Sequence, residues 1–546
     1  RATCEFPQKY GKPGKRRVVV EEFGKKVERE EEVPNVLVHD VEKWANWILE
    51  RAREKIGHLY PPEKDGRPVV GYLWARTAPC SNPSCRGEIP LLRSLLVCNK
   101  KDKKVALTME VDKKAKTVRF GIAEDKAITV TDGTMQNRGN TLCPYCEQVT
   151  PVADLRAAGL AGKMGERMVA VIVEGKGGKG YRPVEKTDLA AFREAAGMDV
   201  ERPGELILPE INAEDADDVA NSTGIRVHLY GMKTWGSLFN PRQLVAMQTF
   251  VACLREALEA MKQESWGAAF QAADSAGKMP APQLDEEYRK AVGIILGLWL
   301  SRIAGRLSNV GLWNVKGEKI EHPFGRQAIP MTWDYPEVNL FADTSGGVEG
   351  QTDWIRRVLL HESNCSEASV VHRGDGAALW LQNGFCDAVV TDPPYFDAIA
   401  YGDLSDYFYV WLKRAIGDLV PEATATPLTP KTDEATALKH RHGGDGEKAD
   451  AHFKSKLAAA FSEAYRVLKP GGVISIMFAH QSTKAWTALV HAIFEAGLTV
   501  DATWPIDTER TFALKASMSA LSSSVTVACR PRVVGSAAAF KQVRKE

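Results

Sequence analysis

The four residues Asp-Pro-Pro-Tyr at positions 392–395 constrain the fold most strongly, because of the segments on either side of them. An apolar run at 388–391 comes before them, and the aromatic-rich segment 396–411 follows. This pattern predicts a buried parallel strand that ends in a stiff turn, since the two prolines fix φ and remove two N–H donors. Open α/β sheets bind their ligands at the carboxyl ends of their strands. The turn would present a carboxylate, a carbonyl and an aromatic ring there.

These groups suit the transfer of a methyl group to the exocyclic amino nitrogen of a nucleobase. The carboxylate of Asp392 and the carbonyl of Pro393 can each accept one N–H bond, which makes the nitrogen more nucleophilic and stabilises its developing positive charge. The ring of Tyr395 offers a face on which a flipped base can stack. The alternative is a plain loop after a strand, because such a match arises by chance in roughly a few per cent of chains of this length.

The residues after this turn alternate between helical and strand patterns. Apolar spacing predicts helices over 453–468 and 486–494, which end before the turn at 470–472 and at Gly497. Strands are expected over 473–479, 498–504 and 524–529, and a further short strand over 370–375 that ends in Gly374-Asp375. The carboxyl-terminal part of the chain is therefore expected to be an α/β domain.

Three of these features together resemble one enzyme family. The segment 389–395, the turn 466–472 and the final strand pair are similar to the catalytic half of the S-adenosylmethionine-dependent amino-methyltransferases that modify N6 of adenine or N4 of cytosine. The resemblance covers roughly residues 340 to 532. It implies a Rossmann-like methyltransferase sheet of which the C-terminal half is present, with Asp392, Pro393, Pro394 and Tyr395 as catalytic residues. It also implies that Gly374 and Asp375 bind the cofactor's adenosine.

Two pairs of cysteines predict a metal site near the other end of the chain. Cys80 and Cys85 form one short hook, and Cys143 and Cys146 form a second. Two such hooks can complete a tetrahedral zinc site with four sulfur ligands, which is typical of structural zinc. A β hairpin over 105–111 and 117–122 would fill the long spacer between them. Four unrelated buried cysteines are the alternative, and Cys98 has no partner hook.

The predicted zinc ribbon narrows the resemblance to one group of methyltransferases. Together with the segment 324–331 and the Asp-Pro-Pro-Tyr turn, it resembles large prokaryotic adenine-specific DNA methylases with an inserted zinc ribbon, which often act in defence against foreign DNA. This implies S-adenosylmethionine and structural Zn²⁺ as cofactors and DNA as a partner. Two alternatives stay open: an RNA base amino-methyltransferase, and a non-catalytic, zinc-stabilised nucleic-acid-binding subunit.

A cofactor site of this class also needs a strand followed by a glycine-rich turn at the start of a helix. Residues 344–350 contain the glycines but show no preceding apolar strand, and residues 175–180 are better explained as a hairpin turn. The glycine-rich element is therefore expected before Arg1 or on a partner subunit.

The remaining sequence predicts a large multi-domain protein. Its 546 residues carry a net charge of +1, and no apolar run is long enough to span a membrane, so a cytoplasmic location is expected. Asn240 and Pro241 mark a helix start, residues 288–307 predict a second helix, and 417–450 reads as a long mobile loop. The expected layout is an N-terminal segment at 1–75, the zinc ribbon insertion at 76–150, a mixed linker and β region at 151–235, a helical region at 236–335, the catalytic half at 336–535 and a tail at 536–546.

Overall fold

The structure is a computed structural model, and it describes residues 1–22, 25–125, 128, 132–175, 178–209, 215–264, 281–325, 327–506 and 524–532. The expected tail at 536–546 lies outside these residues. The chain forms two compact units of mixed α and β structure. Unit 1 comprises residues 1–212, 225–371 and 404–429, and unit 2 comprises residues 213–224, 372–403 and 430–546.

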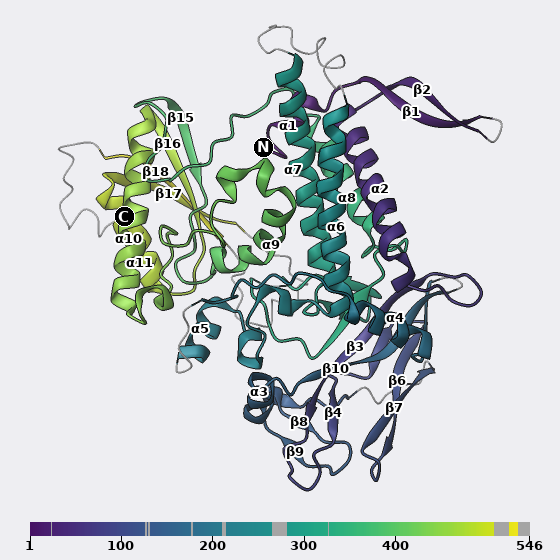
Figure 1. Cartoon of the computed structure of the whole chain (residues 1–546). Helices are drawn as coiled ribbons and strands as arrows, with labels where there is room; N and C mark the ends of the chain where they lie inside the picture. Colours follow the sequence, from purple (N-terminus) through teal and green to yellow (C-terminus); the bar gives the residue numbers. More distant parts are fainter. Residues whose placement is uncertain are drawn as a thin grey trace. The chain divides into compact units, whose positions relative to one another are not determined.

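Unit 1 contains a group of long helices that lie side by side (Figure 1). They are α2 (Val36–Ile56), α6 (Pro241–Ala260), α7 (Ala281–Leu307) and α8 (Val348–Glu362). The expected start of α6 is confirmed, because the Asn240 side chain accepts the N–H of Gln243 and Pro241 occupies the first turn. The expected helix over 288–307 is also confirmed, although α7 begins seven residues earlier.

The main sheet of unit 1 is antiparallel, in the order β11-β10-β3-β14, with β4 also paired to β3. A fully buried ion pair joins it to the helices. The Nε of Arg242 on α6 lies 2.6 Å from Oε1 of Glu337 on β14, and Trp74 Nε1 donates to Glu337 Oε2 at 2.7 Å. The strands are β3 (Val69–Pro79), β4 (Glu88–Leu91), β10 (Gly165–Gly175), β11 (Gly178–Arg182) and β14 (Asp334–Val338).

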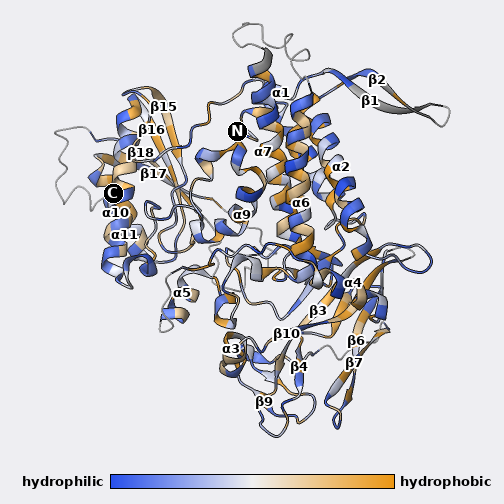
Figure 2. Ribbon diagram, in the orientation of Figure 1, coloured by the Kyte–Doolittle hydropathy of each residue, from blue (hydrophilic) through white to orange (hydrophobic). Residues whose placement is uncertain are grey.

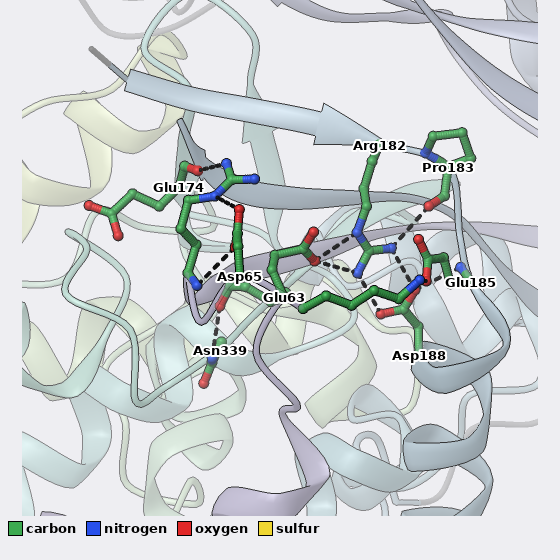
Figure 3. Close-up of polar contacts among 11 residues, drawn as sticks. Glu63, Asp65, Glu174, Arg182, Pro183, Glu185, Asp188 and Asn339 are labelled. Atoms are coloured by element: carbon green, nitrogen blue, oxygen red, sulfur yellow. Dashed lines mark hydrogen bonds and ion pairs between the residues drawn. The ribbon is translucent and has the colours of Figure 1, made fainter. Parts of the chain in front are cut away.

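A second ion-pair group fastens helix α4 (Lys186–Gly197) to the end of β11. Arg182 lies 2.7 Å from both Glu63 Oε1 and Asp188 Oδ2 (Figure 3). Asp188 also accepts the backbone N–H of Glu185, so one carboxylate both caps the helix and anchors it to the strand.

Smaller elements complete unit 1. The expected hairpin in the cysteine spacer is confirmed as β6 (Lys104–Asp112) and β7 (Thr117–Glu124). A third strand, β5 (Leu96–Asn99), pairs with the other edge of β6. The sequence did not predict the hairpin β1 (Gly14–Glu22) and β2 (Lys25–Val33). The others are α1 (Phe6–Tyr10), β8 (Thr141–Leu142), β9 (Val149–Thr150), α3 (Val152–Leu160), β12 (Leu312–Asn314) and β13 (Lys319–Glu321).

Unit 2 is built on a four-stranded sheet in the order β15-β16-β18-β17. Strands β15 (Cys386–Thr391) and β16 (Leu468–Phe478) are parallel, while β18 (Ser524–Pro531) runs antiparallel between β16 and β17 (Leu498–Ile506). Helices α10 (Gly446–Val467) and α11 (Thr483–Glu495) cover one face (Figure 1), and the strands are largely hydrophobic (Figure 2). The core between them contains Phe453, Leu457, Phe461, Ile474, Ile476, Phe478, Leu489 and Ile493. The expected helices and the last three expected strands are thus confirmed.

Two expectations for the carboxyl-terminal part of the chain are wrong. Residues 370–375 form no strand, since they pair with no neighbouring strand, and Val370 is 82% exposed. Strand β15 exists and is parallel, but it is not buried, and Val390 is 81% exposed. The reason is that, among the described residues, β15 pairs with β16 along one edge only, and α10 and α11 cover only one of its faces.

The segment 417–450 is more regular than the expected loop. It contains the short 3-10 helices η8 (Gly417–Leu419), η9 (Pro421–Ala423) and η10 (Lys439–His442), and α10 begins at Gly446. Helix α9 (Tyr401–Ile416) precedes it. Among the described helices, none combines the length and the apolar character that a bilayer crossing requires.

Candidate functional site

A pocket of about 610 Å³ lies in unit 2, at the carboxyl end of β15. Three segments and one helix form its walls: residues 374–377, the turn 391–394, residues 430–435 and helix α10, which contributes Lys456, Leu457 and Ala460. The structure therefore brings together the two groups that the sequence singled out, Gly374-Asp375 and Asp392-Pro393-Pro394.

The turn after β15 presents Asp392 to solvent, while Pro393 is buried. Tyr395 does not line the pocket. Its ring contacts Phe478 edge-on, with 5.6 Å between ring centroids, and its hydroxyl bonds to the Asp392 carboxylate. Burial, together with that hydrogen bond, raises the pKa of Tyr395 to about 12. The hydroxyl therefore stays protonated at neutral pH and acts as a donor that orients Asp392.

Asp375 reaches the pocket from a tight local turn. Its Oδ1 accepts the backbone N–H of Ala377 at 2.9 Å, and its carbonyl accepts the N–H of Ala378 at 3.0 Å. These bonds fix the carboxylate without using its second oxygen. That oxygen can accept a hydrogen bond from a ligand hydroxyl or amine.

The wall at 430–435 was not among the candidate site residues of the sequence. Asp433 forms an ion pair with Lys456 at 2.6 Å, which raises the pKa of Lys456 and lowers the pKa of Asp433. The Glu434 carboxylate accepts the backbone N–H of Gly402 at 3.0 Å and bonds to Arg441. The only sequence signal for this wall was the expectation of a long mobile loop over 417–450.

The charges around the pocket are unequal. Asp375, Asp392, Asp433 and Glu434 line it, whereas Lys456 is the single cation among its lining residues. Asp433 and Glu434 are already paired with Lys456 and Arg441. The attraction for a ligand comes from Asp375 and Asp392, and such carboxylates favour a positively charged or hydrogen-bond-donating ligand. The pocket is therefore suited to a ligand that brings cationic or amino groups to the end of β15.

Unit 1 contains a separate candidate site formed by Cys80, Cys85, Cys143 and Cys146. All four Sγ atoms lie within 4.8 Å of one another, and the pairs Cys80–Cys146 and Cys85–Cys143 are each 3.7 Å apart. A tetrahedral zinc ion with Zn–S bonds of about 2.3 Å separates its sulfurs by about 3.8 Å. The expected hooks thus have the geometry of a closed metal site.

The two hooks fold alike despite their different lengths. In the first, Cys80 N–H donates to the Gly87 carbonyl at 2.9 Å, and in the second, Cys143 N–H donates to the Gln148 carbonyl at 2.9 Å. The residue after each second cysteine has a positive φ, 54° at Arg86 and 59° at Glu147. This conformation is uncommon for residues other than glycine. The same positive φ at Arg86 and at Glu147 indicates that one structural requirement shapes the backbone of both hooks.

The thiols of this cluster differ in their protonation. Burial raises the pKa of Cys143 to about 12, whereas the pKa of Cys146 is lowered to about 7, because the Gln148 N–H and the neighbouring thiols outweigh its burial. Cys98 lies outside the cluster, and its Sγ is 3.5 Å from the Lys103 carbonyl. The donor set of the hooks therefore fits Zn²⁺ without Cys98.

The glycine-rich segments have structural explanations. A Cβ at Gly347 would lie 2.1 Å from the Ala342 carbonyl, and one at Gly350 would lie 2.7 Å from that of Thr344, so the turn before α8 needs glycine for its own packing. A buried strand, β14, does precede this turn, contrary to expectation. The sequence did not show it because Glu337, which is buried in an ion pair with Arg242, interrupts the apolar pattern of the strand. Gly175 pairs with Gly178 across β10 and β11, as expected for a hairpin, while residues 176–177 lie outside the described part of the chain.

Comparison with known proteins adds no further assignment to these two sites. No family model, no curated protein and no solved structure matches this chain.

Proposed function

We propose that the protein is an S-adenosylmethionine-dependent methyltransferase that modifies the N6 amino group of a flipped adenine in DNA. One observation carries the proposal: the Gly374-Asp375 turn and the Asp392-Pro393-Pro394 turn, nearly twenty residues apart in sequence, line a single acidic pocket at the end of a parallel strand. Such strand ends are the usual ligand sites of α/β sheets.

The side chains of the pocket have distinct roles in this proposal. Asp392 and the Pro393 carbonyl accept the two N–H bonds of the adenine amino group, and Asp375 holds the adenosine part of the cofactor. Tyr395 orients Asp392 through its hydroxyl. Stacking of its ring on the adenine remains part of the proposal and requires the ring to turn away from Phe478. S-adenosylmethionine supplies the methyl group when bound, and its positive charge suits the acidic pocket.

The sheet order supports the same proposal. In unit 2 the antiparallel strand β18 lies between β16 and β17, which run parallel to each other, and a mostly parallel sheet of this kind is compatible with the Rossmann-like sheet that the resemblance implies. None of the residues that line the pocket begins a helix. We propose that a partner chain or another segment of the polypeptide supplies the glycine-rich turn, beside the edge of β15 that pairs with no described strand.

The zinc ribbon of unit 1 has a supporting role in the proposal. Its four thiolates leave no ligand position open for a substrate, so the ion would act in folding and not in chemistry. We propose that the ribbon holds DNA or a partner subunit.

The test compares two neighbouring carboxylates on the same segment. The chain is incubated with methyl-labelled S-adenosylmethionine and unmethylated duplex DNA or structured RNA. Asp392→Asn is expected to lower transfer to adenine by about 100-fold or more, since it removes a charged acceptor at the reacting nitrogen. The control Asp387→Asn changes an exposed carboxylate of β15 that pairs with Lys469 and should leave the rate unchanged.

The other outcomes separate the alternatives. Label on RNA alone would identify an RNA base methyltransferase. A chain that transfers no label to either substrate and shows no cofactor binding by calorimetry, even when partner proteins are supplied, would be a non-catalytic binding subunit.

A further inference from the structure

The turn that presents Asp392 continues into a strained residue. Phe396 has φ +56° and is 3% exposed. A residue with a Cβ rarely adopts this left-handed conformation, and it persists only where the surroundings hold it in place. Its N–H donates to the Pro394 carbonyl at 3.0 Å, so the strained residue is tied to the second proline across Tyr395.

Several groups hold Phe396 and the residue after it. The ring of Phe396 packs edge-on against Phe453 and against His480, with centroid distances of 5.0 and 5.7 Å. Its carbonyl accepts the N–H of Ala437 at 3.0 Å. Oδ1 of Asp397 lies 3.1 Å from Nε2 of His480.

His480 comes from the loop between β16 and α11, next to the carboxyl end of the neighbouring strand. Its Nδ1 accepts the backbone N–H of Ser482 at 3.0 Å, and its carbonyl accepts the Nε1–H of Trp486 at 2.9 Å. Because Nδ1 is an acceptor, Nε2 carries the hydrogen and donates it to Asp397. The imidazole is therefore fixed at both nitrogens, and its side chain is only 12% exposed.

We propose that His480 is a positioning residue: through Asp397 and the ring of Phe396 it clamps the strained turn, and so fixes Asp392 and the Pro393 carbonyl at the end of β15. His480 does not line the acidic pocket and touches no proposed reactant. The catalytic consequence of the clamp rests on the proposed function, whereas the clamp itself does not.

The first arm of the test measures amide hydrogen exchange without any substrate. In His480→Gln the amide Nε2 lies near the position of the imidazole Nε2, so this variant keeps the donor to Asp397. In His480→Asn the amide Oδ1 lies near the position of Nδ1, so this variant keeps only the acceptor for Ser482. The proposal expects faster exchange in peptides covering 394–400 for His480→Asn and for Asp397→Leu, and near-normal exchange for His480→Gln. His491→Gln, on the exposed face of α11, is the matched control.

The second arm measures methyl transfer. In His480→Asn and Asp397→Leu the two acceptors, Asp392 and the Pro393 carbonyl, should be misplaced at the reacting nitrogen, which is expected to lower kcat by about 10- to 100-fold with little change in KM. His480→Gln should retain most of the wild-type rate. If the wild-type chain transfers no methyl group, the proposed function fails, but the exchange measurements still show whether His480 holds the turn. The two failures can therefore be told apart.

Two results would overturn the clamp. One is unchanged exchange at 394–400 in both His480→Asn and Asp397→Leu. The other is equally faster exchange throughout β16 and α11, which would make His480 a general folding residue of unit 2.

Discussion

At the scale of single residues, geometry and not burial separates the four hook cysteines from Cys98. All except Cys146 are buried, and so is Cys98, but only the hook thiols converge within 4.8 Å. We expect Cys80→Ser to abolish stoichiometric zinc binding, because a hydroxyl is a poor zinc ligand, and Cys98→Ser to retain it. Metal analysis of the purified variants by mass spectrometry checks this. Equal zinc loss in both variants would contradict the assignment of the hooks.

The candidate residues that the sequence did reveal share one property, which is local spacing. The cysteine hooks and the Asp392 turn are recognisable within a few residues, so they can be singled out as candidate sites without a fold. Glu434 and His480 could not be predicted in the same way. Their roles depend on contacts with Gly402 and Asp397, which lie 32 and 83 residues away.

At the scale of elements, the buried pair of Arg242 and Glu337 joins helix α6 to strand β14. Both side chains are fully buried, and removal of one partner leaves an uncompensated charge. We expect Arg242→Met to lower the free energy of unfolding of unit 1 by about 3–5 kcal/mol. Arg255→Met, which removes an exposed arginine of the same helix that pairs with Asp418, should cost under about 1 kcal/mol. Urea unfolding followed by tryptophan fluorescence compares the two, and equal losses would argue against the pair as a stabilising contact.

Glu318, in the turn between β12 and β13, gives a pH-dependent prediction. It is buried, but bonds from Lys100 and Tyr181 outweigh that burial and lower its pKa from the ordinary 4.5. A carboxylate with a lowered folded pKa stabilises the protein above its unfolded pKa, and this stabilisation is lost as the pH falls through the folded value. We therefore expect Glu318→Gln to be less stable than the wild type at pH 7, with a difference that shrinks below pH 4.5. Thermal unfolding across this range tests it, and a difference that grows toward acid pH would contradict the sign.

Elements were predictable where the apolar pattern was clear, as in helices α10 and α11 and in strands β16, β17 and β18. Prediction failed where the deciding factor was a neighbour. Residues 370–375 have the sequence pattern of a strand but pair with no other described strand. Strand β14 was missed because the charged Glu337, which is buried beside Arg242, interrupts its apolar pattern. A sequence pattern shows which residues prefer burial, but it does not show whether another strand or a counter-charge is present.

At the scale of the whole molecule, the four-cysteine cluster and the acidic pocket belong to different compact units. The cluster has its own supports within unit 1: Lys113, at the tip of the β6–β7 hairpin, pairs with Glu147 at 2.6 Å, and Lys116 donates to the Ser84 carbonyl at 3.3 Å. The hairpin tip is thus tied to both hooks. Zinc should therefore order the hairpin as well as the cysteines.

This arrangement predicts a local response to metal removal. Structural zinc sites contribute folding free energy directly, so a chelator should release the hooks and, with them, the tip of the hairpin. We expect amide exchange to accelerate in peptides covering 80–87, 113–118 and 143–148, and trypsin to cleave at Lys113 and Lys116 much faster. Peptides from β16 and α11 of unit 2 should exchange at the same rate with and without chelator, because their core of Ile474, Ile476 and Leu489 contains none of the four hook cysteines. Faster exchange in both units would show that zinc supports the whole chain, and no change at the hairpin would show that its lysine contacts do not depend on the metal.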